Sequence, residues 1–156
     1  CRTSGSAHYS VDLGGPAIPW LSAVVSGEWS PHGLPAYEEY QIGNYSVGRG
    51  YAPGAASGDS GIGVQLEARA DFGLGSALGS GASLGLFGFF DAAQLWNEDP
   101  LSYDSDVSSL GGGLRFRMNR TQLSLFYAAP QSPPFPSAED PDGRVLVTLT
   151  RSFSVR

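Results

Sequence analysis

Charged residues are scarce in this sequence, and their scarcity narrows the classes of protein that it can encode. They make up 15% of the 156 residues, and there is neither a lysine-rich surface nor a long helical stretch of Ala, Glu, Lys and Leu. The net charge is −6 and the pI is near 4.7, whereas binding to a phosphate backbone needs a basic face. We therefore expect no nucleic acid among the partners.

Long hydrophobic runs and paired cysteines are also missing. No run approaches the roughly 18 to 20 apolar residues of a membrane-spanning helix, which leaves a β-barrel as the only way for this chain to span a membrane. Cys1 is the only cysteine, so no intrachain disulfide can form, and we expect it to mark a cut or fragment end rather than a lipoprotein N-terminus. His8 and His32 have no Cys, Asp or Glu at metal-ligand spacing, so we expect neither a metal nor a cofactor.

Glycine, proline and aromatic residues are abundant. The chain has 22 Gly and 11 Pro, and its aromatic fraction is 12%, which fits an all-β protein with many turns. Apolar and polar residues alternate with period 2 in about seven segments, as they do in half-buried strands. The predicted strands are His8–Leu13, Trp20–Trp29, Gly61–Asp71, Ser83–Trp96, Gly111–Asn119, Thr121–Tyr127 and Arg144–Val155.

The segments are joined by two kinds of connection, short turns and long, polar, proline-rich loops. The short turns lie at 14–16, 73–80 and 118–120, and the long loops lie at 31–60, 97–106 and 130–143. Short turns on one side and long loops on the other are the layout of an outer-membrane barrel.

The distribution of charges favours a barrel over a soluble β-sandwich, which alternates in the same way. Glu67 and Arg69 share one strand face, as do Arg115 and Arg117, and aromatic residues cluster near strand ends; both features are typical of a membrane barrel with a polar lumen. We therefore predict an antiparallel transmembrane β-barrel with a long lumenal loop at about 31–60. Bacterial barrels have an even number of strands, so we expect the whole chain to be the C-terminal part of a larger barrel domain.

A glycine-rich stretch interrupts the strands at 43–51, with the sequence Gly-Asn-Tyr-Ser-Val-Gly-Arg-Gly-Tyr. Together with Glu39, Gly58-Asp59 and Glu67, this stretch resembles the haemolysin secretion/activation family, the outer-membrane transporters of two-partner secretion. That family belongs to the same superfamily as the barrel-assembly factor BamA. Its second motif, Phe-x-x-x-Asp, is matched by Phe87–Asp91. The POTRA region and the N-terminal half of the barrel of that family have no counterpart in this sequence.

The resemblance implies a docked loop. In the family, an Arg-Gly-aromatic tip on a long loop folds back into the barrel lumen; here Gly48 precedes Arg49, which looks like a Gly-Arg-Gly-Tyr subgroup. Arg49 is implied to dock on Asp91, which shares a strand face with Phe87. Glu67, also lumenal by parity, is a second candidate partner, because a buried guanidinium needs an acidic or carbonyl acceptor.

The residues next to Arg49 would shape the loop. Gly48 and Gly50 let the backbone turn sharply and approach the barrel wall, and Tyr51 would stack nearby. Gly58 and Asp59 would organise the return turn of the loop rather than carry chemistry.

An enzyme has little support in the sequence. Gly58 to Gly61 resembles the Gly-Asp-Ser-Gly around a serine-protease nucleophile, but no further protease pattern surrounds it. The resemblance implies instead a transporter that exports an unfolded partner exoprotein across the bacterial outer membrane, in contact with the lipid bilayer. The alternatives are an assembly and insertion factor for outer-membrane proteins, and a small passive porin or structural barrel.

Overall fold

A computed structural model describes residues 3–12, 18–43, 47–75, 81–98, 102–135, 139 and 141–153 of the protein. The chain is all-β, as predicted. The strands are β1 (Thr3–Asp12), β2 (Ile18–Trp29), β3 (Tyr40–Gln41), β4 (Ser57–Gly58), β5 (Ser60–Gly73), β6 (Ala82–Trp96), β7 (Ser105–Met118), β8 (Thr121–Pro130) and β9 (Arg144–Arg151). In the described ranges, no helix is long and apolar enough to cross a membrane.

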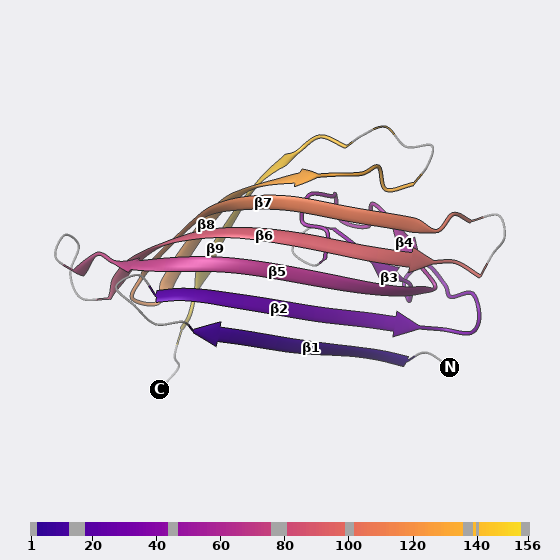
Figure 1. Cartoon of the computed structure of the whole chain (residues 1–156), viewed down its shortest axis with the longest axis horizontal. Helices are drawn as coiled ribbons and strands as arrows, with labels where there is room; N and C mark the ends of the chain where they lie inside the picture. Colours follow the sequence, from indigo (N-terminus) through magenta and orange to yellow (C-terminus); the bar gives the residue numbers. More distant parts are fainter. Residues whose placement is uncertain are drawn as a thin grey trace.

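Seven long strands form one antiparallel sheet in the order β1-β2-β5-β6-β7-β8-β9 (Figure 1). Each long strand pairs with the next long strand along the chain. The short strands β3 and β4 lie in the connection between β2 and β5 and pair with each other. The prediction of seven antiparallel strands, one of them following a long loop, is therefore confirmed.

Some strand ends differ from the prediction. β7 begins at Ser105 rather than at Gly111. The prediction missed the first half of this strand because serines occupy buried positions there and conceal the apolar alternation. β1 also begins earlier than predicted, in a segment with few apolar residues that pairs with β2 through its backbone. β9 ends at Arg151. The expected end of that strand, Val155, and the expected turn at 14–16 lie outside the described residues.

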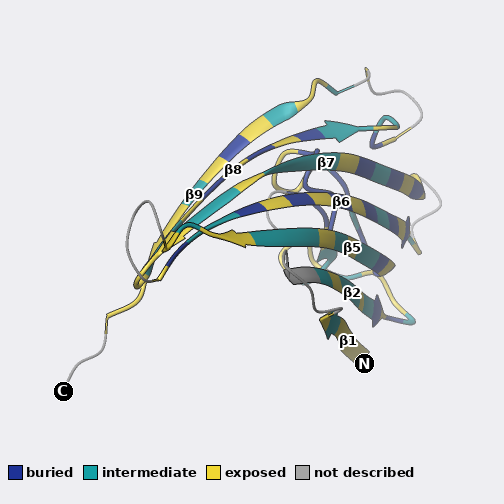
Figure 2. Cartoon of the chain, turned by 60° about the vertical axis from the view of Figure 1, so that its left-hand side comes forward, coloured by how far each residue is buried: buried dark blue, intermediate teal, exposed yellow. Residues whose placement is uncertain are grey.

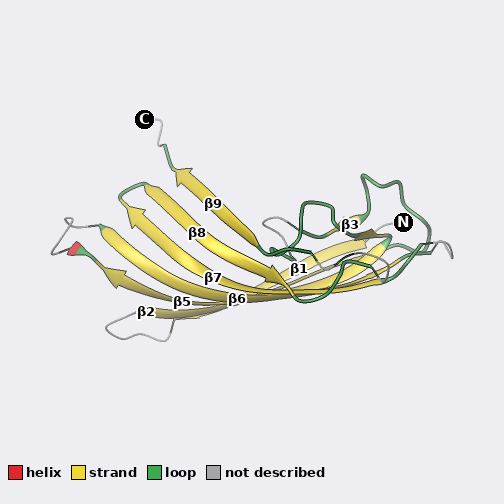
Figure 3. Ribbon diagram, turned by 90° about the horizontal axis from the view of Figure 1, so that it is seen from above, coloured by secondary structure: helices red, strands yellow, loops and turns green. Residues whose placement is uncertain are grey.

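The sheet is curved (Figure 3), and buried and exposed residues alternate along its strands (Figure 2). On β6, the buried residues Phe87, Phe89 and Asp91 face the concave side, whereas the exposed residues Leu86 and Phe90 face the convex side. The β2–β5 connection lies on the concave side (Figure 3). The period-2 pattern therefore separates a face that is covered by the chain itself from a face that is left bare.

The convex face is a broad apolar band. Its exposed side chains include Leu21, Val25, Ile62, Leu66, Phe72, Leu86, Phe90, Leu110, Leu114, Leu123, Leu125, Val145, Val147 and Leu149. On β5 the band runs from Ile62 to Phe72; at about 3.3 Å per residue and a tilt of about 40°, such a length spans roughly 25 Å, the height of the apolar band of an outer-membrane barrel. An apolar surface of this extent is suited to lipid rather than to water.

Candidate functional site

The β2–β5 connection is a packed element of the concave face rather than a solvated loop. Its residues Ile42, Val47 and Tyr51 form one hydrophobic cluster with Leu95 of β6 and Val107 of β7. All five side chains are buried. Apolar burial of this kind fixes the course of the loop along the sheet.

Tyr40 in β3 packs the loop against the sheet. The Tyr40 hydroxyl lies 2.7 Å from Oγ of Ser26 on β2. The ring occupies space above Gly61 and Gly63 of β5, where a Cβ atom would lie 2.6 Å from a ring carbon and 2.5 Å from the hydroxyl oxygen, respectively. Burial raises the pKa of the Tyr40 phenol, so the hydroxyl stays protonated and keeps its hydrogen bond to the wall.

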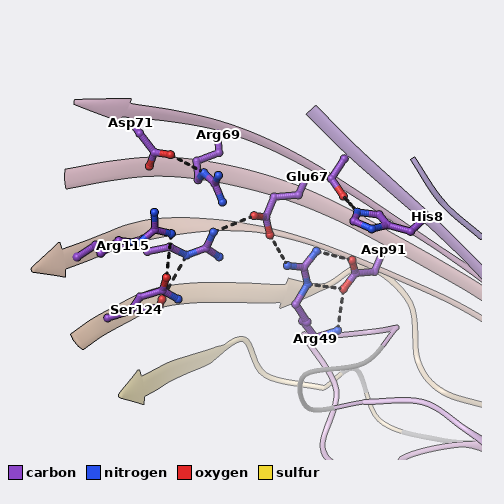
Figure 4. Close-up of polar contacts among 11 residues, drawn as sticks. His8, Arg49, Glu67, Arg69, Asp71, Asp91, Arg115 and Ser124 are labelled. Atoms are coloured by element: carbon purple, nitrogen blue, oxygen red, sulfur yellow. Dashed lines mark hydrogen bonds and ion pairs between the residues drawn. The ribbon is translucent and has the colours of Figure 1, made fainter. Parts of the chain in front are cut away.

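The tip of the loop is anchored by Arg49 on Asp91 (Figure 4). The contact is bidentate, with Nε 2.9 Å from Oδ2 and Nη2 2.7 Å from Oδ1. The backbone N–H of Arg49 also donates to Oδ2, at 3.0 Å. Arg49 is 9% exposed and Asp91 is 0% exposed. Three hydrogen bonds and a full positive charge thus compensate a carboxylate that is removed from solvent, as burial of a charge requires.

Glu67 extends this ion pair into a network across the concave face (Figure 4). Its Oε2 accepts a hydrogen bond from Nη1 of Arg49 at 3.0 Å, and its Oε1 accepts one from Nη1 of Arg115 at 3.3 Å. Nε of Arg115 lies 3.4 Å from Oγ of Ser124 on β8. The two carboxylates of Asp91 and Glu67 alternate with two guanidiniums, so the formal charges of the network cancel.

Three aromatic rings lie beside the network. Phe87 and Phe89 of β6 each make an edge contact with Phe126 of β8, with centroids 5.7 and 5.8 Å apart. The guanidinium carbon of Arg49 lies 3.7 Å from the centroid of Phe89, and that of Arg115 lies 4.7 Å from the centroid of Phe87. Because a ring face attracts a cation, most strongly where water is excluded, these phenylalanines hold both arginines in place.

Two glycines allow the tip to reach the wall. Gly48 has a φ of +83°, a conformation that favours glycine, and its carbonyl accepts a hydrogen bond from the Tyr51 amide at 2.9 Å, which closes a turn. A Cβ atom on Gly50 would lie 2.7 Å from the nitrogen of Pro130 and 2.9 Å from Cβ of Ser109. The tip therefore approaches β7 and β8 so closely that a side chain at position 50 has no room.

Tyr51 fastens the far side of the tip. We expected its ring to stack; the contacts of its hydroxyl are with the carbonyl oxygens of Ser108 and Ser132, at 2.8 and 2.7 Å. Arg144, at the start of β9, donates a hydrogen bond to the Tyr51 carbonyl from 93 residues away. Sequence reasoning missed Arg144, because no local signal distinguishes this arginine from any other at a strand end.

Gly58 and Asp59 lie at the end of the loop, away from the tip. The two carboxylate oxygens of Asp59 accept hydrogen bonds from the backbone amides of Leu34 and Glu98, the latter at 2.9 Å. Asp59 thus ties the start of the loop to the β6–β7 connection, a wider role than the return turn that we predicted. A Cβ atom on Gly58 would lie 2.9 Å from the carbonyl oxygen of Trp96, so this glycine permits the same close approach.

The serine of the protease-like sequence has a structural contact. Oγ of Ser60 accepts a hydrogen bond from the amide of Ser30 at 3.0 Å, and both residues are buried. This bond joins the end of β2 to the start of β5. The Gly-Asp-Ser-Gly sequence therefore fixes the two ends of the loop.

A curved antiparallel sheet with an apolar convex face, a charged concave face and a loop docked by a buried ion pair is consistent with part of the wall of a membrane β-barrel. The sequence matches the family described as the Omp85 superfamily domain over residues 2–143, and the chain belongs to this superfamily. No curated protein matches the sequence. The superfamily consists of transporters and assembly factors that handle protein substrates, and together with the fold it points to the bacterial outer membrane.

Proposed function

We propose that this chain forms the C-terminal part of the barrel of a two-partner secretion transporter, which exports an unfolded exoprotein. In this proposal the loop at 31–59 occludes the lumen when Arg49 is docked on Asp91. The observation that carries the proposal is the burial of this ion pair. A bidentate contact with a carboxylate that is 0% exposed fixes the tip of a long loop against the wall, so that release of this contact is a necessary step in freeing the tip.

The chemistry of the two faces supports passage of a chain through such a lumen. The convex face would contact the lipid bilayer through its apolar band, while the concave face offers hydrogen-bonding groups to an extended polypeptide. Arg69, for example, is 2.9 Å from Asp71 and lies over the ring of Trp20. β1 and β9 are each paired on one side in the described part of the chain, and further strands would complete the wall beside them.

Export and conductance of the intact protein in lipid vesicles test the proposal. We expect Arg49→Ala to raise ion conductance, because the loop leaves the lumen, and to change export of the partner exoprotein at least tenfold, because the gate is lost. Arg117→Ala is the matched control, since Arg117 is exposed on the same face and contacts Gln122. Unchanged export with impaired insertion of outer-membrane proteins would favour an assembly factor. A steady conductance with neither activity would favour a passive porin.

A further inference from the structure

We propose that the wall around Asp91 is a binding site for Arg-Gly-Tyr-like segments in general, which the loop occupies until a segment of the exported chain replaces it. The inference rests on the proposed function and names the substrate feature that this site reads. The ligand would be an extended peptide segment with an arginine, a following glycine and then an aromatic residue with a hydroxyl group. We call the site, formed by Glu67, Phe89, Asp91, Ser108 and Pro130, the Arg-Gly cradle.

The cradle selects arginine through four separate contacts. Asp91 takes Nε and Nη2 at 2.9 and 2.7 Å, Glu67 takes Nη1 at 3.0 Å, and Phe89 lies 3.7 Å below the guanidinium carbon. A planar fork of donors satisfies all of these positions at once, whereas the ammonium of lysine is a point charge that cannot make the bidentate contact.

The cradle also selects the two residues that follow. At position 50 the nitrogen of Pro130 would lie 2.7 Å from any Cβ atom, so only glycine fits after the arginine. At position 51 the carbonyl oxygens of Ser108 and Ser132 lie 2.8 and 2.7 Å from the tyrosine hydroxyl, and a phenol can donate its proton to one of them. These contacts are with atoms of β7, of β8 and of the connection after β8, all outside the loop, so they are open to any chain of the same sequence.

When the loop leaves the cradle, Asp91 is left without the cation that it binds in the docked state. When Arg49 leaves, Glu67 keeps Arg115 at 3.3 Å, but the carboxylate of Asp91 loses all three of the hydrogen bonds that Arg49 gives it. A carboxylate without its guanidinium can accept another one in the same bidentate geometry, so the open state is stabilised by whichever segment brings a guanidinium. An arriving Arg-Gly segment would therefore favour release of the loop, as a ligand shifts an equilibrium toward the state that it binds.

Peptide binding to a vacated cradle tests the inference. The probe is a fluorescein-labelled peptide with the sequence of residues 47–52, and its binding to the intact protein in detergent micelles is followed by anisotropy. Gly50→Ala vacates the cradle without changing a wall residue, because the new Cβ cannot fit against Pro130. Gly73→Ala is the control, since a Cβ there meets nothing within 4 Å. The double variant Arg49→Ala/Tyr51→Ala vacates the cradle by a second route if Gly50→Ala fails to fold.

We expect the peptide to bind the vacated variants at least tenfold more tightly than the wild type and Gly73→Ala. Adding Asp91→Asn, or replacing the arginine of the peptide with lysine or alanine, should weaken binding at least tenfold. Equal affinity for wild type and vacated variants, or equal affinity of the alanine peptide, would overturn the inference. Export assays separate it from the proposed function: export that depends on Arg49 without peptide binding contradicts the cradle alone, whereas peptide binding without any export contradicts the transporter alone.

Discussion

Removal of the Arg49 side chain perturbs the docked loop at a buried ion pair. In Arg49→Ala, the carboxylate of Asp91, which is 0% exposed, loses the bidentate guanidinium. Removing one partner of a buried ion pair costs about 3–5 kcal/mol. Because about 1.4 kcal/mol corresponds to a factor of ten, the equilibrium for opening of the loop should rise by roughly a hundredfold to a few thousandfold.

Hydrogen exchange of the loop measures this opening directly, since amides that exchange through local unfolding report its free energy. The amides of Tyr51 and Gly54 donate to the carbonyls of Gly48 and Ile42, at 2.9 and 3.0 Å, so they lose protection when the tip is released. We expect both amides to exchange faster in Arg49→Ala, by roughly a hundredfold to a few thousandfold. Arg117→Ala, an exposed substitution on the same face, should change the free energy of loop opening by less than about 0.5 kcal/mol.

A double-mutant cycle decides whether the ion pair is the cause. Asp91→Ala should open the loop less than Arg49→Ala does, because Arg49 keeps its 3.0 Å contact with Glu67. The double variant should be no worse than Arg49→Ala, since neither buried charge is then left without its partner. If the losses of the two single variants simply add, Arg49 and Asp91 act independently and their ion pair does not dock the loop.

Two further changes test the faces and the loop ends. Leu114→Arg on the convex face should destabilise the protein in vesicles by about 2–4 kcal/mol in urea unfolding, whereas Ser10→Arg on the concave face should have little effect; equal losses would contradict the assignment of the lipid face. Asp59→Ala removes the acceptor of the Leu34 and Glu98 amides, at a cost of about 1–3 kcal/mol. It should speed exchange at both amides, and unchanged protection there would contradict the tie between the two loops.

The period-2 alternation of apolar and polar residues is enough to predict the sheet and its two faces. Alternation placed Phe87 and Asp91 on one face of β6 and Glu67 on the matching face of β5, and register then brings these strands side by side. It failed at the start of β7, where Ser105 and Ser109 are buried. A buried serine adds nothing to the apolar alternation, so a prediction from the sequence pattern assigns its position to a loop.

The course of the loop depends on the curvature of the sheet, which no local pattern encodes. The Arg49–Asp91 pairing was expected because a buried arginine needs an acid and a family motif supplied one. The contact of Arg144 with Tyr51 was not, because it joins residues 93 positions apart and exists only once β9 has curved around to the tip. The sequence shows a glycine at position 50 but not the reason for it. The reason is the nearby nitrogen of Pro130, which leaves no room for a Cβ atom. The tip is thus held from β6, β7 and β9 at once, so its release requires these contacts to break together.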